Sequence, residues 1–278
     1  MKPVSILFTL LFLFSVSLSF AQSQEDSWAS VKSAGKGTLS CVWNEAYGIA
    51  FRDDKGNLKG VCIDILDDFK AFVKEKYSVN LQVTLVEDKS FSSFLSKVEG
   101  ATYLLGVSSV SITDDRKKKF QFTPYYLSNP NVIVTHRDAP KLTALEDLGT
   151  VYKGYTLKVV SGSTHRSFAN TLKTKYYPDL KIAEATSSRD IFEEVSNNKT
   201  LFTIIDFGEY LGAFKNKLPL TRQPVNLGVD DKLGFVMNKK SDWGAVWQEF
   251  LTDAYRKSAG YKKIIADNLG LAYLGMIQ

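Results

Sequence analysis

One segment of the 278-residue chain combines a single arginine with closely spaced hydroxyl groups. Residues 108–116 read SSVSITDDR, so that an apolar stretch leads into hydroxyls, an acidic turn and then Arg116. An arginine can hold a carboxylate through two parallel hydrogen bonds, a geometry that lysine cannot match. Hydroxyl and backbone N–H groups nearby can complete the carboxylate's partners. The alternative is a capped helix start followed by a solvated basic run over residues 116–119, which composition alone favours.

The other groups that could do chemistry are sparse. His136 and His165 stand alone, without a second histidine or cysteine at metal-ligand spacing, and we expect both on the surface or in loops. Residues 162–164 (GST) lack the second glycine of a nucleophile elbow. Residues 35–38 (GKGT) lack the upstream glycine of a phosphate-binding loop. The sequence therefore predicts no enzyme, no catalytic residue, no metal and no cofactor.

The overall composition is that of an ordinary globular protein. Charged residues make up 23% and hydrophobic residues 44% of the chain, which excludes a disordered, collagen-like or disulfide-scaffold protein. The formal net charge is only +5 and both signs are mixed along the chain, so there is no electrostatic footprint for nucleic acid.

The first 21 residues have the pattern of a signal peptide. Lys2 is followed by an almost wholly apolar run over residues 4–20, and the small residues around Ala21 suit a signal peptidase. The alternative is an uncleaved membrane anchor, for which the run is slightly short. We expect cleavage after Ala21, an exported protein, and a flexible polar lead-in over residues 22–37.

Two cysteines remain after that cleavage, Cys41 and Cys62. In an oxidising compartment an even pair can form a disulfide, and two buried thiols are the alternative. The residues alone leave both possibilities open.

Strand-like and helix-like segments alternate along the rest of the chain. Alternation of this kind predicts α/β layers with parallel strands, and it occurs once before and once after about residue 130. Strands are expected at residues 38–43, 81–86, 103–110, 131–135, 157–160, 182–185, 201–205 and 233–237. Helices are expected after Gly60, after Ser90, at residues 142–148, 163–175 and 189–196, and after Ser241. Two α/β units side by side leave a cleft, the usual place for a small ligand.

Residues 108–116, with Phe120 and residues 122–126 (FTPYY), resemble the hallmark of the family 3 extracellular solute-binding proteins. These are the polar amino-acid receptors of bacterial ABC importers. Residues 56–64 (GNLKGVCID) are similar to the same family's opening and to the ligand cores of ionotropic glutamate receptors. The resemblance covers about residues 38–269.

The resemblance implies an α/β fold of the two-lobe periplasmic-binding-protein type (type II), with the ligand cleft between the lobes. Lobe 1 would comprise residues 38–128 and 229–278, and lobe 2 residues 130–226. The chain would cross between the lobes at hinges near residue 129 and residues 224–228.

It also implies charged partners for a zwitterionic ligand. Arg116 would clamp the α-carboxylate, and Asp206, which ends a later strand, would pair with the α-ammonium. Thr164 and the backbone N–H groups that open its helix would approach the carboxylate from lobe 2. Physical chemistry supports this set, because a buried zwitterion needs one cation and one anion around it.

Further contacts follow from the same resemblance. Ser109 and Ser111 would lie near the ligand's α-amino and α-carboxylate groups. Tyr47 and Phe51 would wall the side-chain pocket, where aromatic rings supply apolar area at low entropic cost. Core packing is the alternative for Tyr47.

The implied function is a monomeric periplasmic receptor that delivers an amino acid or analogue to an ABC permease. Two alternatives share the fold: a sensory module for a separate membrane partner, and a periplasmic dehydratase of the cyclohexadienyl type. The enzyme would need a general acid or base in the cleft, for which Glu45 and Asp64 are the candidates.

Overall fold

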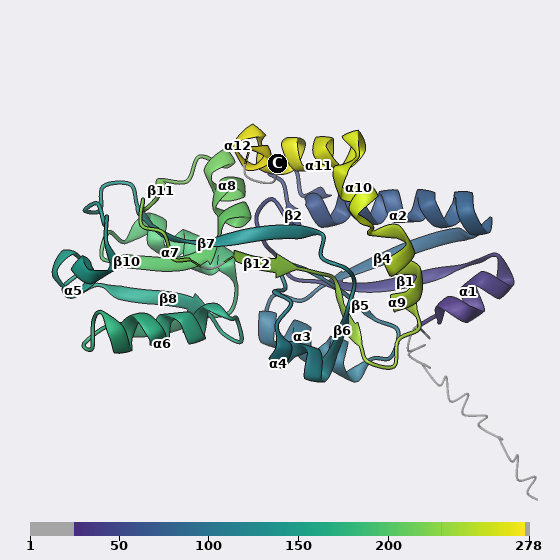
Figure 1. Ribbon diagram of the computed structural model, residues 1–278, viewed down its shortest axis with the longest axis horizontal. Helices are drawn as coiled ribbons and strands as arrows, with labels where there is room; N and C mark the ends of the chain where they lie inside the picture. The colour runs from purple at the N-terminus through teal and green to yellow at the C-terminus, as the bar shows by residue number, and fades with distance from the viewer. Residues whose placement is uncertain (1–24, 229, 276–278) are drawn as a thin grey trace, which may run out of the picture.

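The computed structural model describes residues 25–228 and 230–275. It has two α/β lobes, each built on its own sheet, which lie side by side with strands β7 and β12 running between them (Figure 1). This arrangement confirms the predicted two-lobe α/β fold. The signal peptide expected at residues 1–21 lies outside the described residues.

The first lobe contains a five-stranded sheet in the order β4-β1-β5-β13-β6. Its strands are β1 (Lys36–Trp43), β4 (Asn80–Glu87), β5 (Leu105–Val107), β6 (Phe120–Phe122) and β13 (Val236–Asn238). Strand β1 is parallel to both β4 and β5, so the carboxyl ends of all three point to one edge of the sheet. That edge faces the second lobe and carries the loops of the site.

Helices cover both faces of this sheet (Figure 1). They are α1 (Trp28–Ala34), α2 (Val61–Tyr77), α3 (Phe91–Gly100), α4 (Asp114–Lys119), α9 (Trp243–Phe250), α10 (Asp253–Lys257), α11 (Ala259–Leu269) and α12 (Leu271–Leu274). Aromatic side chains dominate the core, and the rings of Phe69 and Trp247 stack with centroids 3.9 Å apart. A short hairpin of β2 (Phe51–Arg52) and β3 (Leu58–Lys59) precedes α2.

The second lobe is organised around β7 (Leu127–His136) and β10 (Leu201–Asp206), which pair antiparallel. The sheet order is β11-β7-β10-β8-β9, with β8 (Thr156–Val160), β9 (Lys181–Ala185) and β11 (Leu220–Arg222). Around it lie η1 (Leu145–Asp147), α5 (Leu148–Val151), α6 (His165–Lys175), α7 (Ser188–Asn197) and α8 (Phe207–Lys215). Strand β12 (Asp230–Leu233) pairs with the start of β7, so two strands connect the lobes.

Several local expectations need correction. Residues 25–37 are no loose lead-in, because α1 packs Trp28 and Val31 into the first core. The expected strand at 103–110 shortens to Leu105–Val107, and the one at 233–237 divides into β12 and β13. Both sheets also contain antiparallel pairs, so the strands are not all parallel as predicted.

The lobes pack directly against each other. The rings of Tyr47 and Phe192, from opposite lobes, lie 5.8 Å apart, and the Phe91 backbone N–H donates to the Thr186 carbonyl at 3.1 Å. A β-carbon at Gly212 in α8 would lie 2.5 Å from the Tyr47 carbonyl carbon, so this glycine permits the close approach. The lobe limits and the hinges near 129 and 224–228 stay predictions.

Cys41 and Cys62 are free, buried thiols, which decides the open alternative against a disulfide. Burial raises the pKa of Cys62 to about 12, so its thiol stays protonated at neutral pH. Among the described residues, no helix has both the length and the apolar character needed to cross a membrane.

Candidate ligand site between the lobes

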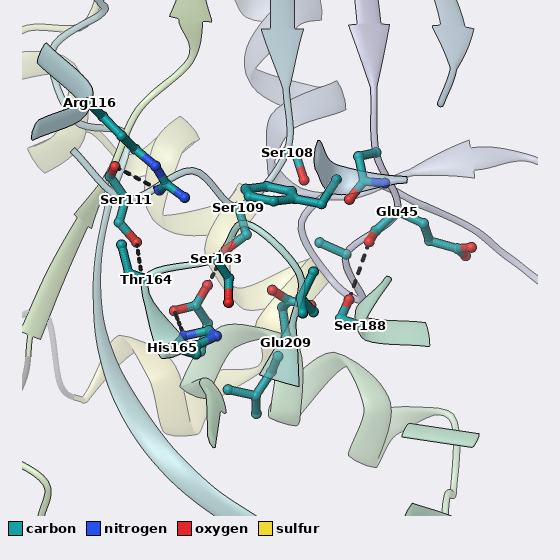
Figure 2. Close-up of a pocket in the computed structure, with 16 residues that line it drawn as sticks. Glu45, Ser108, Ser109, Ser111, Arg116, Ser163, Thr164, His165, Ser188 and Glu209 are labelled. Carbon is teal, nitrogen blue, oxygen red and sulfur yellow. Dashed lines mark hydrogen bonds and ion pairs between the residues drawn. The ribbon is translucent and has the colours of Figure 1, made fainter. Parts of the chain in front are cut away.

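A pocket lies between the two lobes, where the carboxyl ends of β1, β5 and β10 meet the starts of α6, α7 and α8 (Figure 2). Its empty space is about 380 Å³, which includes its opening. Water molecules could be centred in only about 30 Å³ of it, so the pocket is narrow in this arrangement of the lobes. Five of the seven predicted site residues line it: Ser109, Ser111, Arg116, Thr164 and Asp206.

Arg116 enters the pocket from the first turn of α4. The Thr113 side chain caps this helix by accepting from the Arg116 backbone N–H at 3.2 Å. The guanidinium then donates to two carbonyl oxygens, that of Ser111 at 3.1 Å and that of Gly162 in the other lobe at 3.2 Å. Burial lowers the pKa of Arg116, and the carboxylates of Asp206 and Asp231 oppose that shift, so the group keeps its charge.

The basic run beside Arg116 behaves as the alternative interpretation expected. Lys117 and Lys118 pair with Asp114 and Asp115 three residues earlier, on the exposed side of α4. The helix start is therefore both capped and solvated, while Arg116 alone turns into the pocket. The predicted carboxylate-binding arginine and the predicted solvated basic run therefore lie on opposite faces of one short helix.

Asp206 faces Arg116 from the second lobe. It ends β10, precedes α8 and is only 2% exposed. One of its carboxylate oxygens, Oδ2, accepts a short hydrogen bond from the Ser109 hydroxyl of the first lobe. The other, Oδ1, lies 3.6 Å from His165 Nε2. The carboxylate therefore sits at the boundary between lobes, within reach of both.

Ser111 and Thr164 form a second contact across the pocket. Their hydroxyl oxygens are 3.4 Å apart, and the Ser111 hydroxyl also donates to Asp231 Oδ2 at 2.8 Å. Thr164 directly precedes α6, and in the first turn of that helix the Arg166 and Ser167 backbone N–H groups already donate to the Ser163 and Thr164 carbonyls at 3.4 and 3.1 Å. Thr164 and Ser111 lie on the same side of the pocket as Arg116 (Figure 2), so two hydroxyl groups and one guanidinium could face a carboxylate.

Tyr47 and Phe51 are not among the residues that line the pocket. Tyr47 is 8% exposed and packs against Phe51, Phe192 and the Arg189 guanidinium. In this arrangement its position matches the core-packing alternative. The aromatic residue that does line the pocket is Phe91, whose ring lies 5.5 Å from the Arg116 guanidinium carbon.

The histidine expectation was wrong. His136 lies in β7 and His165 in the first turn of α6, and both are buried. His165 lines the pocket, with Nε2 3.0 Å from Asn131 Oδ1. No local sequence pattern marks it, because its burial depends on the packing of α6 against β8 and β10.

Glu209 is the second pocket residue that the sequence did not single out. It lies in the first turn of α8, is 3% exposed and lines the pocket. Burial and the neighbouring Asp206 carboxylate raise its pKa well above the ordinary value. Two carboxyl groups therefore meet within one pocket.

The two acids considered for an enzyme are placed differently. Glu45 lines the pocket, and its Oε2 lies 2.8 Å from Arg189 Nε. Asp64 lies in α2, outside the pocket lining, and accepts a hydrogen bond from the Asn268 side chain at 2.6 Å. The described residues contain no group of three or more His, Cys, Asp or Glu side chains able to hold a metal ion.

Comparisons with known proteins identify the family of the chain. The family model described as bacterial extracellular solute-binding proteins, family 3, matches residues 40–269. Among curated relatives, an arginine-binding extracellular protein, ArtP, from Bacillus subtilis is 24% identical over 82% of this chain and 79% of its own length. A membrane-bound lytic murein transglycosylase F from Saccharophagus degradans is 30% identical over 51% of the chain. The first two curated relatives are matched over only 27% and 46% of their own lengths.

Solved structures show the same architecture. A P235GK mutant of ArgBP from T. maritima superposes with a TM-score of 0.70 at 19% identity, covering 86% of this chain and 97% of its own. The ancestral amino-acid-binding protein AncCDT-1, a precursor of cyclohexadienyl dehydratase, gives 0.69 at 22% identity, covering 84% and 96%. At these identities the likeness establishes the fold alone.

Proposed function

The chain belongs to the bacterial extracellular solute-binding proteins of family 3, and from that premise we propose that it captures an amino acid between its lobes. It then delivers the ligand to an ABC importer. The protein acts as a monomer in the periplasm, after removal of the signal peptide at residues 1–21.

One observation carries this proposal: Arg116 and Asp206, from different lobes, line the same buried pocket. They are a cation and an anion, and an amino acid carries the matching pair of charges. The ligand carboxylate would take bonds from Arg116, Ser111 and the start of α6. Its ammonium would lie against Asp206 and Ser109. Because each ligand charge touches both lobes, binding favours the closed arrangement.

The expected affinity follows from these charged contacts. A hydrogen bond to a charged group contributes roughly 1.5–3 kcal/mol. Two or three of them, with burial of the side chain, support a dissociation constant near 1 μM, which corresponds to about −8 kcal/mol.

A thermal-shift screen of the twenty amino acids with the purified mature protein tests the proposal. A ligand present at one hundred times its dissociation constant adds about 2.7 kcal/mol of stability, which the screen detects easily. We expect at least one amino acid to shift the melting temperature of wild type and not of Arg116→Ala. A flat screen contradicts the proposal.

A second candidate is a dehydratase, favoured by the buried carboxyl of Glu209 in the pocket. Burial and the neighbouring Asp206 carboxylate raise the pKa of that carboxyl, which favours the protonated form that a general acid needs. The candidate predicts turnover of prephenate or arogenate by the purified protein and loss of turnover in Glu209→Gln. Absence of turnover in wild type removes it.

A further inference from the structure

His165 is a buried titratable residue to which the proposed function assigns no task. It begins α6, is 5% exposed and lines the pocket beneath Ser163 in the view of Figure 2. Its Nε2 lies 3.0 Å from Asn131 Oδ1 in β7 and 3.6 Å from Asp206 Oδ1 at the end of β10. Asp206 is the carboxylate proposed to receive the ligand ammonium, so the imidazole ring lies directly beside that anion.

The neighbours of the ring fix which nitrogen carries a proton. The Asn131 side-chain amide donates from Nδ2 to Asp231 Oδ2 at 3.5 Å, while its Oδ1 faces His165. Asn131 Oδ1 and Asp206 Oδ1 are both acceptors, so Nε2 is the ring nitrogen that bears hydrogen.

The other ring nitrogen, Nδ1, has no such restraint. Within the described ranges 25–228 and 230–275, His165 Nδ1 and Asp206 Oδ1 are both buried without a hydrogen-bond partner. Nδ1 can therefore gain or lose a proton without breaking a protein contact, whereas Nε2 keeps its proton throughout. Histidine is the side chain that ordinarily changes charge between pH 5 and pH 8.

We propose that His165 sets the pH dependence of ligand capture, because its protonated form competes with the ligand ammonium for Asp206. The inference rests on the proposed function and adds a residue that governs when the same site binds. With a neutral ring, 3.6 Å is too long for a hydrogen bond, so Asp206 Oδ1 stays available to an ammonium. A protonated ring at that distance forms an ion pair with Asp206 and places a like charge beside the ammonium. Both effects weaken binding as the pH falls.

Other charged groups surround the ring. Those that line the pocket with it are Asp206 from β10, Glu209 from α8, Arg116 from α4 and Glu45 after β1, and Asp231 of β12 contacts Asn131. Arg166 of α6 pairs with Glu184 of β9, and Lys158 of β8 pairs with Glu194 of α7, so these two cations already have partners. Burial and Asp206 raise the pKa of Glu209. Its protonation on acidification would also weaken the binding of a cation, so the test must separate Glu209 from His165.

The chain offers a matched pair of variants, since it contains only two histidines. His136 is also buried, but it lies in β7 outside the pocket lining, and its Nδ1 accepts from the Asp138 backbone N–H at 3.1 Å. In His165→Gln the side-chain amide can still donate to Asn131 in place of Nε2, but it does not titrate. His136→Gln removes the other histidine and leaves the pocket lining as it is.

The test is isothermal titration of wild type, His165→Gln and His136→Gln at pH 5.5 and pH 7.5. The probes are those of the standard L-amino acids, histidine excepted, that raise the melting temperature of wild type. We expect the dissociation constant of wild type and of His136→Gln to rise roughly fivefold or more from pH 7.5 to pH 5.5. In His165→Gln we expect a rise of no more than about twofold, the share left to Glu209. Binding by His165→Gln at pH 7.5 also shows that the variant is folded.

Each contrary result has a distinct meaning. A wild-type affinity that does not change with pH overturns the inference and leaves the proposed function intact. The same rise in His165→Gln as in wild type assigns the pH dependence to Glu209 and overturns it. A loss in His165→Gln that is equal at both pH values, relative to wild type, assigns His165 a purely structural role and also overturns it. If wild type binds no amino acid at either pH, the proposed function fails and the inference fails with it.

Discussion

The two ends of the pocket are held in different ways. At one end the Arg116 guanidinium meets neutral carbonyl oxygens, those of Ser111 and Gly162, one from each lobe. At the other end Glu209 lies beside the Asp206 carboxylate, where burial and the like charge both oppose ionisation. The Arg116 guanidinium donates to backbone carbonyls, whereas the nearby carboxyl groups of Asp206 and Glu209 oppose each other's ionisation.

The Arg116 end and the acidic end of the pocket therefore have different consequences for a bound ligand. The carbonyls hold Arg116 in place without neutralising it, so it stays available to any α-carboxylate. At the acidic end, burial and Asp206 raise the pKa of Glu209, so this end disfavours a further negative charge. Arg116 would thus serve every amino acid.

The largest effect is expected at the Arg116 end. Arg116→Ala should weaken amino-acid binding at least tenfold, since it removes the charged partner of the ligand carboxylate. Arg116→Lys should recover only part of the loss, because lysine cannot form the paired hydrogen bonds. Calorimetry measures both, with the exposed Lys118→Ala as control. Unchanged affinity in Arg116→Ala would refute the clamp.

The next effect concerns how closely α8 approaches the first lobe. In Gly212→Ala the new methyl group would meet the backbone of Tyr47 and Gly48 at 2.5–2.7 Å, and backbone cannot move aside cheaply. We expect a loss of about 1–3 kcal/mol in the free energy of unfolding, typical of overpacking, or an opening of the lobes visible by small-angle X-ray scattering.

Gly100→Ala is the matched control for that variant, because a β-carbon there meets nothing within 4 Å among the described residues. Wild-type stability and an unchanged scattering profile in Gly212→Ala would show that this contact does not limit how closely α8 approaches the first lobe.

A smaller effect is expected from pH. The pKa of Glu209 is raised in the folded state. The residue therefore destabilises the folded state least below its pKa in the unfolded chain, about 4.3, because it is protonated in both states there. The free energy of unfolding then falls as pH rises towards the pKa of Glu209 in the folded state. In urea unfolding, wild type should therefore lose stability relative to Glu209→Gln as pH rises above the unfolded pKa. A difference that is constant with pH would contradict the raised pKa.

The smallest effect on stability is expected from reduction of the two cysteines in the core of the first lobe. Cys41 and Cys62 are buried free thiols, so reducing agent should leave the melting temperature unchanged. Both thiols should react with a disulfide reagent only after unfolding. A fall in melting temperature on reduction would indicate a bridge.

The sequence predicted the fold and the Arg116 end because their signals are local. Alternating apolar segments predict strands and helices, and residues 108–116 carry a recognisable motif. The Glu209 end depends on tertiary packing. Helix α8 was not predicted because Gly208 and Gly212 lower its helix propensity, yet Gly212 is required where α8 contacts Tyr47. With the helix unrecognised, nothing indicated that Glu209 lines the pocket.

A crystal structure of the protein grown with the amino acid that gives the largest thermal shift tests the central claim most directly. The account predicts the α-carboxylate within hydrogen-bond distance of Arg116 and the α-ammonium against Asp206, with both lobes in contact with the ligand. A ligand bound elsewhere, or one that leaves Arg116 on its carbonyl partners without touching it, would contradict the account.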